Sequence, residues 1–216
     1  MNRLCWSFVP AAFFAATLMQ AQDAPVVKAK SWEVGGYGGF TRGEGKTSGL
    51  FGANFGYAFS KAIFPYAEFN YFPNMSRRLN VDSALFNSSG YQTSVTEVNT
   101  GLHYRFAPRP GSKFVPYLIG GVGFLRYPAG STVIGVKRPG AADLQNAVSV
   151  DGTTGASING GAGLRIYVNE RFGFRTEVKM YKPFVEAGRL SGISSGTVGL
   201  DKAFTRVAFG IFWQSN

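Results

Sequence analysis

Side-chain alternation with a period of two constrains this chain more than any other feature of its sequence. It begins at Trp32 and continues almost to the C-terminus. The clearest stretch is 172–181, in which Phe, Phe, Thr, Val and Met alternate with Gly, Arg, Glu, Lys and Tyr. Successive side chains of a β-strand point to opposite faces of the sheet, whereas a helix repeats about every 3.6 residues. The sequence therefore predicts an all-β fold.

Eight segments carry this period, separated by stretches rich in Gly, Asn, Ser and Pro. We predict strands at 32–40, 50–59, 64–72, 96–106, 114–127, 156–168, 172–181 and 202–214. The connections after the second, fourth and sixth strands are short, at 60–63, 107–113 and 169–171. The others are longer, most clearly 73–91, 128–154 and 183–201. This alternation predicts an antiparallel, eight-stranded up-and-down transmembrane β-barrel with periplasmic turns, outer loops and both termini in the periplasm.

The N-terminus predicts export. Residues 1–21 combine a short positive start at Arg3 with an apolar stretch from Phe8 to Met19, which is typical of a signal peptide cleaved after Ala21. We expect a short periplasmic segment at 22–31 and one barrel domain at 32–216. The only cysteine, Cys5, would leave with the signal, so the mature chain would form no disulfides. Nothing after the signal approaches the ~18 consecutive apolar residues of a membrane-spanning helix.

The composition limits the partners. Hydrophobic residues make up 45% of the chain and charged residues 16%, and the formal charge of +10 falls to +9 without the single arginine of the signal, which has no acidic residue. The Lys and Arg residues are scattered singly or in pairs, so no nucleic-acid-binding patch is expected. A positive surface suits anionic lipid and lipopolysaccharide headgroups equally well.

Charged residues of the predicted strands share the face opposite the apolar one. They are Glu33, Glu68, Glu97, Arg105, Arg126, Arg165, Arg175, Glu177, Lys179 and Arg206. A soluble barrel of lipocalin type would alternate too, but it would not need aromatic residues at both ends of its strands. Such residues are present here: Trp32, Phe59, Phe106, Phe114, Phe172 and Trp213 at the turn end, and Phe40, Phe51, Tyr71 and Tyr127 at the loop end. We interpret these as interfacial girdles around a charged lumen.

The chain resembles the OmpA-like and OmpX-like outer-membrane barrel families over essentially all of its mature length. The resemblance rests on the motif at 35–40 (GGYGGF), the motif at 116–123 (PYLIGGVG) and the aromatic final strand. It implies residence in the outer membrane, contact with outer-membrane lipids and folding by the outer-membrane assembly machinery. The family's assembly signal is matched by Arg206, Ala208, Ile211 and Trp213, although three residues follow the terminal aromatic. No peptidoglycan-binding domain follows the barrel.

The short enzyme motifs in this sequence are only weak matches to their patterns. Residues 192–196 (GISSG) fit the G-x-S-x-G pattern of serine hydrolases, but they lie in a predicted loop far from the only histidine, His103. Outer-membrane lipid A deacylases pair a histidine with a nearby serine on the lipid-facing side, and 103–105 (HYR) lacks the serine. Gly45-Lys46-Thr47 lacks the first glycine of a phosphate-binding loop, because position 40 is Phe40. We expect no catalytic residue, cofactor or metal.

Two classes of function remain. We expect a non-enzymatic barrel with a structural or surface-interaction role, whose outer loops contact lipopolysaccharide or an unidentified extracellular ligand. The alternative is a narrow pore for ions or small solutes, because rings of charge can select ions. An eight-stranded barrel is only wide enough to be filled by its own side chains, which favours an interior ion-pair network over a channel. A lipid-modifying enzyme ranks third.

Overall fold

A computed structural model describes residues 27–43, 46–77, 79–80, 86–88, 91–106, 112–136, 144–185, 188–191, 197–198 and 202–215. The predicted signal peptide lies outside these residues. In the segment predicted at 22–31, residues 27–30 precede the first strand, which begins at Ser31. Among the described residues, no helix is long and apolar enough to cross a membrane.

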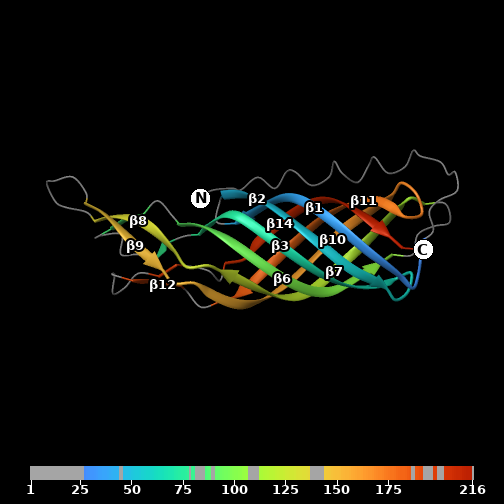
Figure 1. The fold of residues 1–216 in the computed structure, drawn as a ribbon, viewed down its shortest axis with the longest axis horizontal. Coiled ribbons are helices and arrows are strands. Elements are labelled where there is room, and N and C mark those ends of the chain that lie inside the picture. Colours follow the sequence, from blue (N-terminus) through green and yellow to red (C-terminus); the bar gives the residue numbers. More distant parts are fainter. Residues whose placement is uncertain are drawn as a thin grey trace, which may run out of the picture.

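Eight long strands close into a barrel (Figure 1). They are β1 (Ser31–Gly43), β2 (Lys46–Ala58), β3 (Ile63–Arg77), β6 (Tyr91–Arg105), β7 (Phe114–Tyr127), β10 (Thr153–Tyr167), β11 (Phe172–Phe184) and β14 (Phe204–Gln214). Each pairs antiparallel with its chain neighbours, and β1 pairs with β14 to complete the circle. The predicted all-β, eight-stranded antiparallel barrel is confirmed.

The strand bounds differ from the prediction mainly at one end. The strand at 114–127 has the predicted bounds, whereas β1, β2, β3, β6, β10 and β11 continue beyond theirs, mainly at the end opposite the connections 60–63, 107–113 and 169–171. The expected long connection after the first strand is wrong, because only residues 44–45 separate β1 from β2. Polar residues such as Arg42 and Thr47 extend this hairpin, so the apolar period that marks a buried or lipid-facing strand is missing there.

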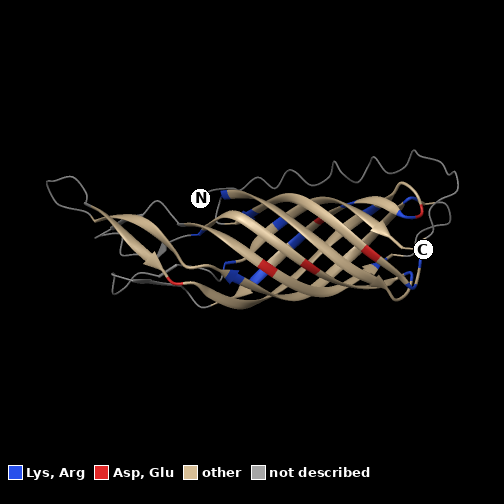
Figure 2. Ribbon diagram, in the orientation of Figure 1, with Lys and Arg blue, Asp and Glu red and all other residues tan. Residues whose placement is uncertain are grey.

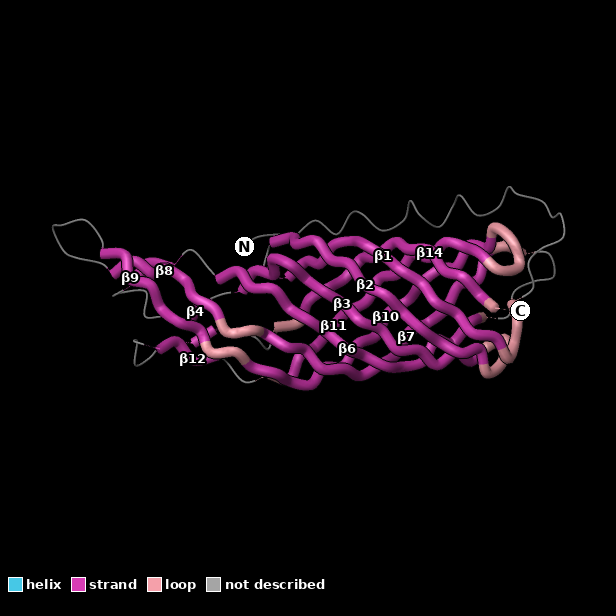
Figure 3. Tube along the Cα trace, in the orientation of Figure 1, coloured by secondary structure: helices cyan, strands magenta, loops and turns pink. Residues whose placement is uncertain are grey.

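The long connections, predicted as loops, contain strands of their own. These are β4 (Leu79–Asn80), β5 (Phe86–Ser88), β8 (Gly130–Val136), β9 (Leu144–Val150), β12 (Gly188–Ser191) and β13 (Thr197–Val198). They form a second sheet in the order β4-β13-β12-β9-β8-β5, which projects from one end of the barrel (Figure 3). We call this the extended end, and the opposite end, where the connections β2–β3, β6–β7 and β10–β11 and the C-terminal end of β14 lie, the turn end.

The outer wall of the barrel is apolar. Exposed large side chains cover the middle of the strands, among them Val98, Leu102, Leu118, Val122, Phe124, Ile158, Val178, Met180 and Phe209. Of the residues predicted as girdles, nine lie on this outer face, whereas Tyr127 is buried and points inward. Most charged residues of the barrel strands are inside, so the barrel is arranged largely apolar-out and polar-in.

Candidate functional site: the charged lumen

Nine of the ten charged residues predicted to line the lumen do so. Each is at most 3% exposed, and acids and bases are interspersed along the strands of the barrel (Figure 2). They are Glu33, Glu68, Glu97, Arg105, Arg165, Arg175, Glu177, Lys179 and Arg206. The lumen of the described barrel is therefore occupied by its own charged side chains.

The tenth, Arg126, was placed on the wrong face. It is exposed on the outer wall, while its neighbours Leu125 and Tyr127 are buried inside. In β7 both inward and outward positions are apolar or aromatic, so the sequence pattern does not show which set faces the lumen. This ambiguity in β7 explains why Arg126 was predicted to face the lumen and Tyr127 to face the lipid.

Two carboxylates and three cations make the central cluster. Glu68 of β3 accepts a hydrogen bond from Lys179 Nζ at 2.6 Å and lies 3.3 Å from Arg206 Nη1. Glu177 of β11 accepts from Arg206 Nη2 at 2.6 Å and lies 3.5 Å from Arg175 Nη1. Because each carboxylate contacts several cations, most of the charge in this cluster is compensated by direct contact between side chains.

Neutral side chains complete this cluster, and the sequence prediction missed them. Tyr117 donates to Glu177 Oε1 at 2.7 Å, and Asn70 donates to Glu97 Oε2 at 2.8 Å. The carbonyl oxygen of Asn70 accepts from both Arg206 and Tyr37, each at 2.7 Å. The inward parity of Asn70 and Tyr37 with Glu68 and Glu33 was the available signal, since buried tyrosine and asparagine need hydrogen-bond partners. The pattern of β7 offers no such signal for Tyr117.

A second cluster lies at the turn end. Arg165 of β10 donates from Nη2 to Glu33 Oε1 at 2.7 Å and lies 3.3 Å from His103 Nδ1. The ring of His103 packs among Phe64, Tyr66 and Tyr117. A protonated guanidinium has no acceptor, so Nδ1 must accept this hydrogen bond and His103 is neutral with its proton on Nε2. His103 is fully buried and faces neither lipid nor solvent.

The lumen becomes apolar toward the extended end. Phe72, Val95 and Leu125 are fully buried there and join one hydrophobic core with Ile134 of β8 and Val148 of β9. One further cation sits in this layer: Arg77, which lies beyond the predicted third strand and was therefore missed. It donates to the Tyr127 hydroxyl at 2.8 Å and stacks over the rings of Tyr127 and Phe204.

The remaining predicted features lie elsewhere. The four residues of the predicted assembly signal all sit on β14, where Arg206 and Ala208 face inward and Ile211 and Trp213 outward. The G-x-S-x-G stretch at 192–196 lies outside the described residues. Lys46 begins β2 as an exposed residue on a hairpin, which is not the strand-to-helix context of a phosphate-binding loop. Among the described residues, no three His, Cys, Asp or Glu side chains come together as metal ligands.

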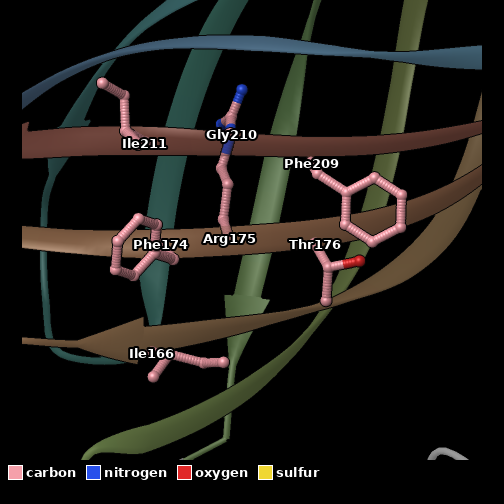
Figure 4. A pocket seen from close by; sticks show the side chains of 7 residues that line it. All are labelled: Ile166, Phe174, Arg175, Thr176, Phe209, Gly210 and Ile211. Atoms are coloured by element: carbon pink, nitrogen blue, oxygen red, sulfur yellow. The ribbon is translucent and has the colours of Figure 1, made fainter.

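A shallow groove marks the outer wall of β10, β11 and β14. Figure 4 shows the side chains of Ile166, Phe174, Ile211 and Phe209 around Gly210, which has no side chain to fill the space. Phe174, Phe209 and Ile211 are about half exposed. The groove is apolar and open, so it offers van der Waals contact but no catalytic group.

Comparison with known proteins gives the fold. No family model matches the sequence, and no curated protein does. A major outer membrane protein from Thermus thermophilus has a similar structure, with a TM-score of 0.57 and 9% identity over 87% of this chain and 100% of that one. OprG from Pseudomonas aeruginosa has a TM-score of 0.49 and 14% identity over 90% and 100% of the two chains. The N-terminal barrel domain of OprF from Pseudomonas aeruginosa has a TM-score of 0.43 and 17% identity over 87% and 98%. The fold is that of a small outer-membrane β-barrel.

Proposed function

We propose that this chain is a non-enzymatic outer-membrane barrel with a closed lumen, which anchors the six-stranded sheet outside the cell for contact with external surfaces. The filled lumen carries this proposal: nine charged side chains, none more than 3% exposed, form interlocking ion pairs and hydrogen bonds inside the barrel. Moving a solute through would require breaking buried ion pairs, which costs about 3–5 kcal/mol for each lost partner.

The outer wall supports residence in a membrane. Large apolar side chains such as Val122 and Phe124 are more than half exposed, which in water would be a severe aggregation hazard. Trp32 and Trp213 are exposed near the turn end, and Phe40 and Phe51 are exposed toward the extended end. Aromatic side chains at both limits of an apolar belt are typical of membrane interfaces.

The apolar layer near the extended end supports the closed state as well. Phe72, Val95 and Leu125 have no exposed surface, and Ile134 and Val148 of the projecting hairpin pack onto the same core. The projecting sheet is thus joined to the barrel by buried contacts, so it can present a defined surface.

Electrical recording tests the closed lumen. The refolded protein, shown to be folded by its heat-dependent gel mobility, is added to a planar bilayer. We expect no discrete conductance steps. Steps whose size changes in Arg175→Ala would instead establish a narrow pore through the lumen and overturn the proposal.

Shortening the projecting hairpin tests the surface role. Residues 133–148 are replaced by a two-residue turn, and proteoliposomes carrying either form are tested for adhesion to lipopolysaccharide-coated and uncoated glass. We expect the shortened protein to fold and to lose adhesion. Equal adhesion of both forms would contradict a role for the sheet, while loss of the folded barrel would contradict an anchor that folds independently of its projection.

A further inference from the structure

The cluster at the turn end contains one more buried cation than carboxylate. Arg105 and Arg165 are both fully buried, and Glu33 is the carboxylate beside them. Glu33 is engaged by Arg165 at 2.7 Å, and His103 is neutral because its Nδ1 accepts from the same guanidinium. Within the described part of the chain, Arg105 forms no ion pair. Among the described residues it is therefore a buried positive charge without a counter-charge of its own.

Several hydrogen-bond donors of this cluster also lack a partner. Arg105 donates one hydrogen bond, from Nη2 to the carbonyl oxygen of Ser60 at 3.1 Å, while its Nε and Nη1 have none among the described residues. In the same described residues the Nε and Nη1 atoms of Arg165 are also unpartnered, and so are Glu33 Oε2 and both side-chain amide atoms of Gln214, which pairs in register with Glu33. Buried N–H groups left without a partner in this way destabilise the folded protein.

The surroundings of this cluster are aromatic and buried. The guanidinium carbons of Arg105 and Arg165 lie 4.9 Å and 4.6 Å from the ring centre of Phe64, so both cations lie against one ring. On the side of the chain terminus, Val27 is 1% exposed and packs with Val115, Tyr167 and Phe212. This packing limits access by bulk water, which could otherwise solvate the extra charge.

We propose that Arg105 and the free N–H groups beside it bind one small monovalent inorganic anion, such as chloride, at the turn end of the lumen. A water molecule would satisfy the donors but would leave the charge uncompensated, whereas a halide does both. The central cluster has a third carboxylate nearby in Glu97, which accepts from Asn70, so Glu68, Glu97 and Glu177 there equal Arg175, Lys179 and Arg206 in number.

The experiment uses the full mature protein refolded in detergent. Its thermal midpoint is measured as sodium gluconate is replaced by sodium bromide at constant ionic strength, and crystals grown in bromide are examined for an anomalous bromine peak. We expect a midpoint that rises to saturation with bromide and a peak within hydrogen-bond distance of Arg105 Nε or Nη1. Arg105→Gln should lose both.

Arg77→Gln is the matched control, because Arg77 is another buried arginine that forms no ion pair within the described residues, but only its Nε lacks a hydrogen-bond partner there. It donates to Tyr127 and Met75 and stacks on two rings. It should keep the full bromide response. A wild-type protein without a bromide-specific rise and without a peak would overturn the proposal, even if Arg105→Gln failed to fold. A response that survives in Arg105→Gln or vanishes in Arg77→Gln would also overturn it.

Discussion

At the scale of single residues, Glu177 is the carboxylate whose loss should cost most. It contacts Arg175, Lys179 and Arg206 and accepts from Tyr117, all in a fully buried setting. Glu177→Gln keeps the shape but leaves the three cations with Glu68 as their main carboxylate, so we expect about 3–5 kcal/mol of lost stability. Urea unfolding in phospholipid vesicles measures this change.

Glu170→Gln supplies the comparison. Glu170 pairs with Lys28 at 3.2 Å, but its side chain is 70% exposed, and exposed pairs contribute about 0–1 kcal/mol. Similar losses in the two variants would show that the central cluster does not stabilise the barrel more than a surface pair does.

The same scale shows how far single positions could be predicted. Alternation in β6 and β11 gave the correct face for Glu97, Arg105, Arg175, Glu177 and Lys179, because each of these strands has one clearly polar side. It failed in β7, where Tyr117 and Tyr127 resemble lipid-facing aromatics yet bury a hydroxyl that bonds to Glu177 or Arg77. Tyrosine is apolar in its ring and polar at its tip, so its type does not reveal its face.

At the scale of elements, the pairing of β6 with β7 depends on glycine at one position and not at its neighbour. A Cβ on Gly101 would lie 2.2 Å from the carbonyl oxygen of Gly120, whereas a Cβ on Gly120 would meet nothing within 4 Å. Gly101→Ala must therefore push the strands apart, and we expect a loss of about 1–3 kcal/mol. Gly120→Ala, on the outer wall, should stay within about 0.5 kcal/mol.

Equilibrium unfolding of both alanine variants measures the difference. Two variants of equal stability would mean that β6 and β7 do not approach as closely as the register implies. The pair is well matched, because Gly101 and Gly120 lie on adjacent strands, one register position apart.

The element scale also shows why the projecting sheet was not predicted. The barrel strands were recognisable because lipid and lumen demand opposite side chains on their two faces, which produces a period of two over many residues. Outside the belt this demand disappears: β8 has Val133 exposed and Ile134 buried, but it spans only Gly130–Val136 between glycine- and proline-rich stretches. Strands this short are fixed by their pairing, here with β9 in a hairpin and with β5, which lies far earlier in the chain and which local pattern does not reveal.

At the scale of the whole molecule, a substitution that destabilises the apolar belt should leave the stability of the projecting sheet unchanged. Val122 of β7 and Val133 of β8 are similar in exposure, at 56% and 51%, but Val122 lies in the middle of the barrel wall and Val133 in the projection. Arginine facing the middle of a bilayer costs about 2–4 kcal/mol, whereas in water it costs almost nothing. Val122→Arg should thus lower the free energy of unfolding in phospholipid vesicles by that amount and reduce the folding yield, while Val133→Arg should match the parent protein.

Folding in detergent micelles, which adapt around a charge, should narrow the difference in stability between the two variants. Equal behaviour of both variants in vesicles would mean that the wall at Val122 does not face lipid, and the barrel would then have to place its apolar surface against protein instead.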